Sequence, residues 1–133
     1  MLSIRFVFPL LLTATICACN SVAQKKISLS PKDFATGITN TGIQVLDVRT
    51  MAEYQSGHLK NSFLADWNNQ SEFKERVAHL DKTKPVYTYC LSGVRSRQAA
   101  DWLQKNGFAT VFNLDGGIVA WKKADMPVEG GQH

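Results

Sequence analysis

Residues 86–100 read VYTYCLSGVRSRQAA, a run that combines a strand pattern, a glycine-containing turn and a helix pattern around one cysteine. The residues before Cys90 are β-branched or aromatic, so the cysteine is predicted to end a strand. Gly93 marks a tight turn, and a helix is predicted to begin at Arg95 and Ser96. Successive backbone N–H groups in such a unit point inward, which stabilises a thiolate at the cysteine.

Cys90 is therefore the candidate nucleophile of this chain. Arg95 adds a fixed positive charge, and a helix N-terminus beside a cysteine lowers the pKa of its thiol, so that the thiolate forms near neutral pH. A buried structural cysteine is the alternative interpretation. Such a cysteine needs neither the glycine turn nor the arginine that follows here.

Residues 1–23 are predicted to be an export leader rather than part of the fold. Arg5 is the only charged residue before an apolar run over residues 6–18. That run has the length of a signal-peptide core and is too short to cross a membrane as a helix. The protein is therefore predicted to be exported to the periplasm or cell envelope of a bacterium.

Two processing sites follow the apolar run. Residues 16–19, ICAC, resemble the lipobox of bacterial lipoproteins, in which cleavage before Cys19 leaves its thiol free to carry lipid. Residues 21–23, SVA, also suit ordinary cleavage, which would release a soluble protein that begins at Gln24. We favour lipid attachment at Cys19, which anchors the protein to a bacterial membrane, and keep the soluble form as the alternative.

The cysteine count strengthens the interpretation of Cys90. The chain has three cysteines, of which Cys17 leaves with the leader and Cys19 is lipidated or removed. Cys90 then has no partner for an intramolecular disulfide, and a lone thiol in an exported protein favours a functional role. The three histidines show no ligand spacing to one another or to Cys90, so no metal site and no cofactor are predicted.

The mature segment has the size of one ordinary domain. We expect residues 24–128 to form this domain as a monomer and residues 129–133 to be a disordered tail. The formal net charge is +4, but lysines and arginines are scattered among acidic residues. Because no basic block contains interleaved aromatic residues, nucleic-acid binding is not expected. The excess positive charge favours small anionic substrates or a membrane surface.

Strand and helix patterns alternate along the mature segment. Apolar or β-branched runs predict five strands, at residues 27–29, 43–48, 62–65, 86–89 and 110–114. N-cap residues predict four helix starts, at Ser30, Thr50, Asn69 and Asp115. Thr50 and Asn69 are each followed three residues later by glutamate, the pattern of a capping box. The alternation predicts an α/β fold with a mainly parallel sheet and helices on both faces.

Functional sites in such sheets form outside the carboxyl ends of the strands. Cys90 ends one predicted strand, and Asp47 and Arg49 lie at the end of another. These three residues are therefore expected at the same edge of the sheet.

Three segments resemble the landmarks of the rhodanese-like domain and occur in the order and spacing of that family. They read LDVRTMAEYQSGHLKNS at 46–62, YCLSGVRSRQAADWL at 89–103 and NLDGGIVAWKKADMPV at 113–128. The resemblance covers nearly all of the mature chain and implies a single domain around a five-stranded parallel sheet. It also implies sulfurtransferase chemistry, in which the loop cysteine takes a sulfane sulfur from a donor, becomes a persulfide and passes that sulfur to an acceptor.

The resemblance implies a role for each site residue. Cys90 matches the nucleophile and Arg95 the anion clamp, so both are expected to be catalytic. The loop is expected to bind substrate through Leu91, Ser92, Gly93, Val94 and Ser96. Asp47 and Arg49 match supporting residues that brace the loop or the adjoining helix through Glu53, with direct participation in the chemistry as the alternative.

The resemblance leaves several donors and acceptors in consideration. Leu91 stands where thiosulfate-specialised members often have a basic residue. A persulfide or polysulfide donor therefore fits this loop as well as thiosulfate does. Cyanide and thiols, including a protein thiol, are the expected acceptors.

Other functions compete with sulfur transfer. Protein tyrosine phosphatases and arsenate reductases also use cysteine, a backbone cradle and arginine, but with five intervening residues, whereas four separate Cys90 from Arg95. A thiol-disulfide oxidoreductase needs a second nearby cysteine. A non-catalytic rhodanese-like binding module of the cell envelope usually lacks the cysteine, and it is kept as the alternative function.

Overall fold

The computed structural model describes residues 25–131, and within this range five strands alternate with five helices. The strands are β1 (Lys25–Leu29), β2 (Gln44–Asp47), β3 (Ser62–Leu64), β4 (Val86–Tyr89) and β5 (Thr110–Leu114). The helices are α1 (Pro31–Gly37), α2 (Met51–Gln55), α3 (Gln70–Val77), α4 (Val94–Lys105) and α5 (Gly117–Lys123).

All five strands form one parallel sheet in the order β1-β5-β4-β2-β3. β4 lies at the centre, where Thr88 is opposite Leu46 of β2 and Asn113 of β5. Neighbouring parallel strands must be joined by long crossover connections, and most of these connections contain one of the helices. The predicted α/β fold with a five-stranded parallel sheet is therefore confirmed.

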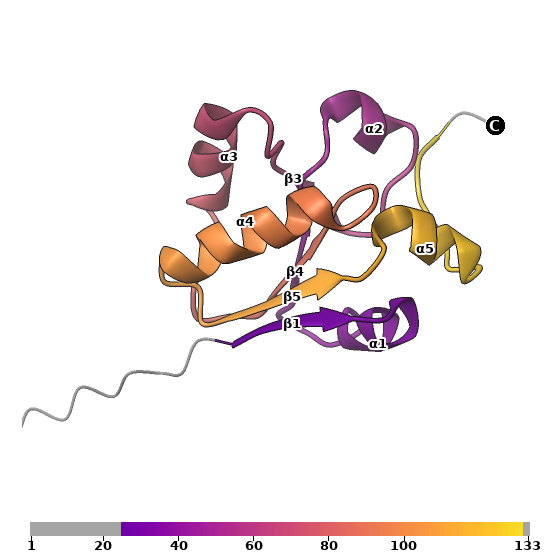
Figure 1. Ribbon diagram of the computed structural model, residues 1–133, viewed down its shortest axis with the longest axis horizontal. Coiled ribbons are helices and arrows are strands. Elements are labelled where there is room, and N and C mark those ends of the chain that lie inside the picture. Colours follow the sequence, from indigo (N-terminus) through magenta and orange to yellow (C-terminus); the bar gives the residue numbers. More distant parts are fainter. Residues whose placement is uncertain (1–24, 132–133) are drawn as a thin grey trace, which may run out of the picture.

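The core has two apolar layers, one on each face of the sheet. Successive side chains of a strand point to opposite faces, and β4 shows this alternation. Val86 and Cys90 pack in the layer shared with α3 and α4, whereas Tyr87 and Tyr89 pack in the layer shared with α1 and α5. In Figure 1, α4 lies above β4 and β5, whereas α1 lies beside the tip of β1 at the lower right. The expectation of helices on both faces is confirmed.

The carboxyl ends of the strands meet at one edge of the sheet. In Figure 1, the arrows of β1 and β5 point toward this edge, where the loop between β4 and α4 lies beside α2 and α5. Every chemical group that the sequence places after a strand end is therefore brought to this side of the molecule.

Three of the predicted helix starts are confirmed, because Ser30, Thr50 and Asn69 are the N-caps of α1, α2 and α3. The capping box at Thr50 is complete, with Glu53 bonded back to the Thr50 backbone N–H. At Asn69 only one half of the predicted box forms. Its backbone N–H donates to the Asp66 carbonyl oxygen at 3.1 Å and is not available to the glutamate.

The predicted N-cap at Asp115 is wrong. Gly116 is the N-cap of α5, and no side chain caps this helix. Gly116 and Gly117 both have left-handed backbone conformations, with φ of 74° and 62°. Their turn delays the start of the helix, while the Asp115 N–H donates to the Leu29 carbonyl oxygen at 2.9 Å.

The predicted disorder of the C-terminal tail is wrong for residues 129–131. Glu129 exchanges two backbone hydrogen bonds with His58, at 2.8 and 2.7 Å. The Gly131 N–H donates to the Gln55 carbonyl oxygen at 3.1 Å. These bonds hold the end of the described chain against α2 and the connection that follows it.

The predicted leader over residues 1–23, the lipid site at Cys19, the alternative start at Gln24 and the last two residues, 132–133, all lie outside the described range. Within residues 25–131, no helix has the length and apolar character needed to cross a membrane.

Candidate active site

Cys90 follows β4 directly and is the one free cysteine among residues 25–131. Its side chain is 1% exposed. The Gly93 N–H donates to the Cys90 sulfur at 3.0 Å, and the Ser96 hydroxyl donates to it at 3.4 Å. The expected strand–turn–helix geometry is therefore present, and its hydrogen-bond donors converge on the sulfur.

These donors favour the thiolate form of Cys90. Burial raises the pKa of the thiol because it disfavours the charged form. Hydrogen bonds from the Ser96 hydroxyl and from the backbone N–H groups of Ser96, Gly93 and Ser92 act in the opposite direction and outweigh burial. The pKa of Cys90 is consequently lowered from its ordinary value, as expected for a nucleophile.

Gly93 makes the tight turn of the loop possible. Its φ of 100° lies in a region that L side chains rarely adopt. This conformation turns the Gly93 N–H toward the sulfur and starts α4 at the next residue. The carbonyl oxygen of Gly93 accepts a hydrogen bond from Arg97 Nε at 3.2 Å, which ties the loop to the first turn of α4.

The start of α5 holds the other side of the loop. The Ile118 N–H donates to the Cys90 carbonyl oxygen at 2.9 Å, and the Val119 N–H donates to the Leu91 carbonyl oxygen at 3.1 Å. A Cβ atom at Gly117 would lie 2.4 Å from the Leu91 carbonyl oxygen, a distance that real Cβ atoms essentially never show. The close approach of helix and loop therefore requires glycine at this position.

Arg95 pairs with Glu53 through two hydrogen bonds. Arg95 Nη1 donates to Glu53 Oε2 at 2.8 Å, and Arg95 Nη2 donates to Glu53 Oε1 at 2.7 Å. The hydrogen bond from Arg95 is the main reason why the pKa of Glu53 falls to about 2. The positive charge that the sequence placed beside the sulfur is therefore matched by a carboxylate of α2.

Asp47 and Arg49 form a buried ion pair with each other. Arg49 Nη2 lies 2.7 Å from Asp47 Oδ2 and also donates to the Gly57 carbonyl oxygen at 2.7 Å. Neither side chain is hydrogen-bonded to Glu53 within the described chain, so the expected link through Glu53 is wrong. Arg95 makes that link instead, while Arg49 supports the segment that ends α2.

The hydroxyl of Tyr89 joins this buried pair to the centre of the sheet. It donates to Asp47 and accepts a hydrogen bond from the Leu59 N–H at 3.1 Å. Burial, followed by the charge of Asp47, raises the pKa of Tyr89, so its phenol stays protonated and can act as this donor. Tyr89 precedes Cys90, and the network therefore supports the end of β4 from the face opposite the sulfur.

The structure brings the predicted loop residues together but in different environments. Gly93 and Ser96 are buried against the sulfur, whereas Leu91, Ser92 and Val94 are exposed at the surface of the loop. Their roles in substrate binding stay predictions.

Sequence reasoning missed two side chains that hold this site. Arg97 bonds the carbonyl oxygen of Gly93, four residues earlier in the chain, and this spacing along a helix was a usable signal. Tyr89 was interpreted only as a strand residue. Its buried hydroxyl depends on contacts between distant strands, for which the sequence carries no local signal.

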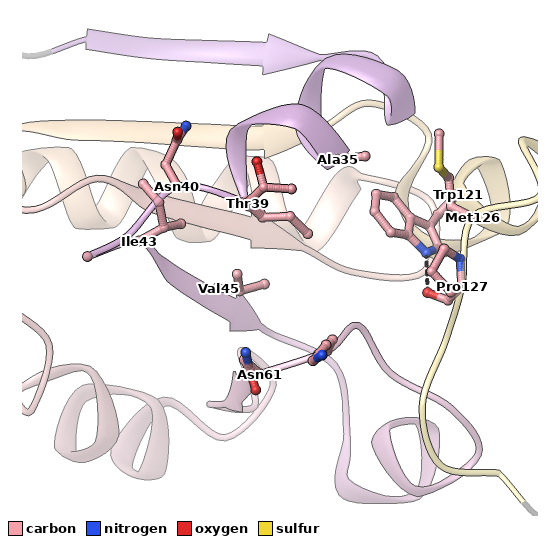
Figure 2. A pocket seen from close by; sticks show the side chains of 12 residues that line it. Ala35, Thr39, Asn40, Ile43, Val45, Asn61, Trp121, Met126 and Pro127 are labelled. Atoms are coloured by element: carbon pink, nitrogen blue, oxygen red, sulfur yellow. Dashed lines mark hydrogen bonds between the residues drawn. The ribbon is translucent and has the colours of Figure 1, made fainter.

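A cavity of about 630 Å³ lies on the other face of the sheet (Figure 2). Its walls include Ile38 after α1, Val45 of β2 and Trp121 of α5, which pack in the layer opposite Cys90. Lys60 is the only ionisable side chain in its lining. The cavity shares no residue with the loop after β4 and has no cysteine in its lining, so the candidate site remains at Cys90.

Within residues 25–131, no three histidine, cysteine, aspartate or glutamate side chains come together as a metal site. The donors around Cys90 are backbone N–H groups and a hydroxyl. Donors of this kind bind anions rather than cations.

A family model described as the rhodanese-like domain matches residues 30–124. Two similar curated proteins are tRNA uridine(34) hydroxylases. The one from Cytophaga hutchinsonii is 37% identical over 95 residues, and the one from Chlamydia caviae is 35% identical over 118 residues. The matches cover 70% and 85% of this chain but 30% and 35% of those proteins, so this chain spans about a third of their length.

Solved structures share the same fold. A rhodanese-related protein from Thermoplasma volcanium is 30% identical, with a TM-score of 0.67 over 77% of this chain and 96% of that chain. The thiosulfate sulfurtransferase from Pseudomonas aeruginosa is 27% identical, with a TM-score of 0.66 over 81% of this chain and 20% of that chain.

Proposed function

The chain belongs to the rhodanese-like domain family, and we propose that it is a sulfurtransferase that carries a sulfane sulfur on Cys90. The observation that carries the proposal is the convergence of the Gly93 N–H and the Ser96 hydroxyl on the Cys90 sulfur. These donors stabilise an anionic sulfur at the base of the loop. Sulfur transfer needs that stabilisation twice, for the attacking thiolate and for the thiolate that leaves at the end.

The reaction has two displacement steps. With thiosulfate as donor, the Cys90 thiolate attacks the sulfane sulfur, a new S–S bond forms, and the original S–S bond breaks as sulfite leaves with the bonding electrons. An acceptor such as cyanide then attacks the outer sulfur of the persulfide. Thiocyanate forms, and Cys90 returns to the thiolate without any external oxidant or reductant.

The donor class follows from the charges around the loop. Arg95 and Arg97 are the cations at the loop; Glu53 balances the charge of Arg95 through two hydrogen bonds, and Arg97 donates to the Gly93 carbonyl oxygen. Leu91 contributes no charge to the entrance. We therefore propose persulfides or polysulfides as donors alongside thiosulfate, and a thiol or cyanide as acceptor.

Replacing Cys90 by serine tests the proposal directly. After treatment with thiosulfate, intact-mass spectra of the wild-type chain should show one added sulfur atom, which cyanide removes. The Cys90→Ser variant should gain none, because a hydroxyl oxygen does not carry a sulfane sulfur, while its circular dichroism stays unchanged. Sulfur on both proteins, or on neither, would remove Cys90 as the carrier and favour a binding module.

The names of the curated relatives suggest a second activity, the hydroxylation of a tRNA uridine. This chain matches about a third of each of those proteins, and the matched third is the rhodanese-like domain. We therefore assign to this chain the chemistry of the shared domain and propose no nucleic-acid substrate. Gel-shift titration with bulk tRNA tests this assignment, since tight binding at physiological salt would favour the activity of the relatives.

We also propose that the protein is exported and anchored by lipid on Cys19, with residues 24–128 as the folded domain. The support is the short apolar run followed by the lipobox-like ICAC sequence at residues 16–19. Membrane fractionation of the wild type and of Cys19→Ala tests the anchor. A wild-type protein that is wholly soluble and begins at Gln24 would show that ordinary cleavage occurs instead.

A further inference from the structure

Exposed large apolar side chains concentrate at one edge of the molecule. Within the described chain, the most exposed are Val94 at 54%, Met51 at 49%, Leu91 at 44% and Val119 at 41%. Each lies a few residues after a strand ends, on the loop after β4 or on the first turns of α2, α4 and α5. We call these four residues the apolar rim.

Hydrogen bonds hold the elements of the apolar rim around the Cys90 loop. The Val119 N–H donates to the Leu91 carbonyl oxygen at 3.1 Å, which brings the first turn of α5 to the loop. The pair between Arg95 and Glu53 brings in the first turn of α2, which Met51 begins. The rim residues therefore lie on the loop of Cys90 and on helix starts that are bonded to that loop or to the helix that follows it.

The four side chains of the apolar rim add no charge around the loop of Cys90. Arg95 and Arg97 are the neighbouring cations: Glu53 accepts two hydrogen bonds from Arg95, and the Gly93 carbonyl oxygen accepts one from Arg97 Nε. Cys90 is almost fully buried, whereas the rim side chains on the loop and on the helix starts beside it are exposed. Exposed apolar side chains that gather in one area of the surface mark sites of interaction with proteins or membranes.

We propose that the apolar rim is the docking surface for a protein acceptor whose cysteine is flanked by apolar side chains. This inference rests on the proposed sulfur transfer through Cys90. The acceptor thiolate attacks the outer sulfur of the Cys90 persulfide, a new S–S bond forms on the acceptor, and the bond to Cys90 breaks. Cys90 leaves as a thiolate with the electron pair, so the step is balanced without a further reactant.

Short peptides test the preference. The full chain is loaded with thiosulfate and offered acetyl-Leu-Cys-Leu-amide or the polar control acetyl-Gln-Cys-Gln-amide, and mass spectrometry follows the peptide persulfide. We expect kcat/KM to be about tenfold higher for the leucine peptide, the effect of partly burying one leucine side chain. Equal rates for the two peptides would overturn the proposal.

Near-isosteric variants locate the preference on the rim. Met51→Gln combined with Val119→Thr should remove most of the preference for the leucine peptide, since both changes replace exposed apolar atoms without adding charge. Val128→Thr is the matched control, because Val128 is 37% exposed but outside the rim. A preference that survives the double variant, or that Val128→Thr also removes, would overturn the assignment.

Two further readouts separate this proposal from its alternatives. Turnover with cyanide should be the same in the wild type and the double variant, because cyanide is too small to use the rim. Absence of cyanide turnover in the wild type would overturn the proposed function as well, whereas turnover without peptide preference overturns only the docking surface. Rim-dependent binding to phosphatidylglycerol vesicles, without any peptide preference, would assign the rim to a membrane instead.

Discussion

Replacing Ser96 by alanine should raise the pKa of the Cys90 thiol and slow its reaction as a thiolate about tenfold at a pH below that pKa. Ser96 is fully buried, and its hydroxyl is the one side-chain donor to the sulfur among the described residues. Hydrogen bonds to charged groups contribute about 1.5–3 kcal/mol. Because 3.4 Å is not a short contact and sulfur is a weak acceptor, we use the lower value. A factor of ten in the thiolate population corresponds to about 1.36 kcal/mol, which gives the predicted tenfold loss of rate.

The rate of iodoacetamide alkylation measures this pKa, because only the thiolate reacts. Mass spectrometry of the peptide that contains Cys90 isolates its rate from that of any other cysteine. The alkylation rate falls as the pH drops below the pKa of Cys90, so a raised pKa moves this fall to higher pH. The Ser96→Ala profile should therefore lie on the alkaline side of the wild-type profile.

Ser92→Ala is the matched control for this experiment. Ser92 donates only its backbone N–H to the sulfur, and its side chain is exposed. The alkylation profile of Ser92→Ala should overlie that of the wild type. An unshifted Ser96→Ala profile, or an equal shift in both variants, would refute the reasoning that the Ser96 hydroxyl stabilises the thiolate.

Arg95→Ala should lower kcat/KM for thiosulfate about 10- to 100-fold and affect uncharged donors far less. The substitution removes a charge-assisted contact and leaves Glu53 unpaired. Assays coupled to cyanide, with thiosulfate and with an uncharged donor, measure this difference. Tyr89→Phe should lower the free energy of unfolding by about 1–3 kcal/mol in urea titrations, because the buried Asp47 loses a donor and the Leu59 N–H loses its acceptor. The pKa of Glu53 is about 2 in the folded protein, below its ordinary value of 4.5. The pair between Glu53 and Arg95 therefore stabilises the fold fully above pH 4.5, and this contribution is lost as the pH falls toward 2. Acid titrations should therefore show a shallower loss of stability in Glu53→Gln over that interval.

Each of these three predictions has a contradicting result. Thiosulfate kinetics that do not change in Arg95→Ala would remove the arginine from the site, and an equal loss with uncharged donors would indicate that it only holds α2. Unchanged stability of Tyr89→Phe would mean that water replaces the hydroxyl. A Glu53→Gln variant with the acid profile of the wild type would show that the pair does not contribute to stability.

The central part of the site could be predicted because its signals are local. The residues that form β4, the turn at Gly93 and the start of α4 follow one another directly, and their order determines where the N–H groups point. The capping box of Thr50 and Glu53 was likewise visible at a spacing of three residues. Elements whose geometry depends on neighbours in the chain were predicted within a few residues.

The partners of charged side chains could not be predicted in the same way. Glu53 and Arg95 lie 42 positions apart in sequence, and they meet because β2 and β4 are neighbours in the sheet. The sequence assigned Glu53 to Asp47 and Arg49, which instead satisfy each other. Choosing between these pairings requires the order of the strands and the direction of each side chain, and neither is set by local pattern.

The parallel sheet also separates the two ends of the domain. β1 begins at Lys25, at the amino edge of the sheet, whereas the loop of Cys90 lies beyond the carboxyl edge. One strand of this length spans on the order of 16 Å. The described chain therefore begins at the edge of the sheet that faces away from the sulfur. The parallel sheet thus keeps the first described residue and the candidate nucleophile at opposite edges of the domain.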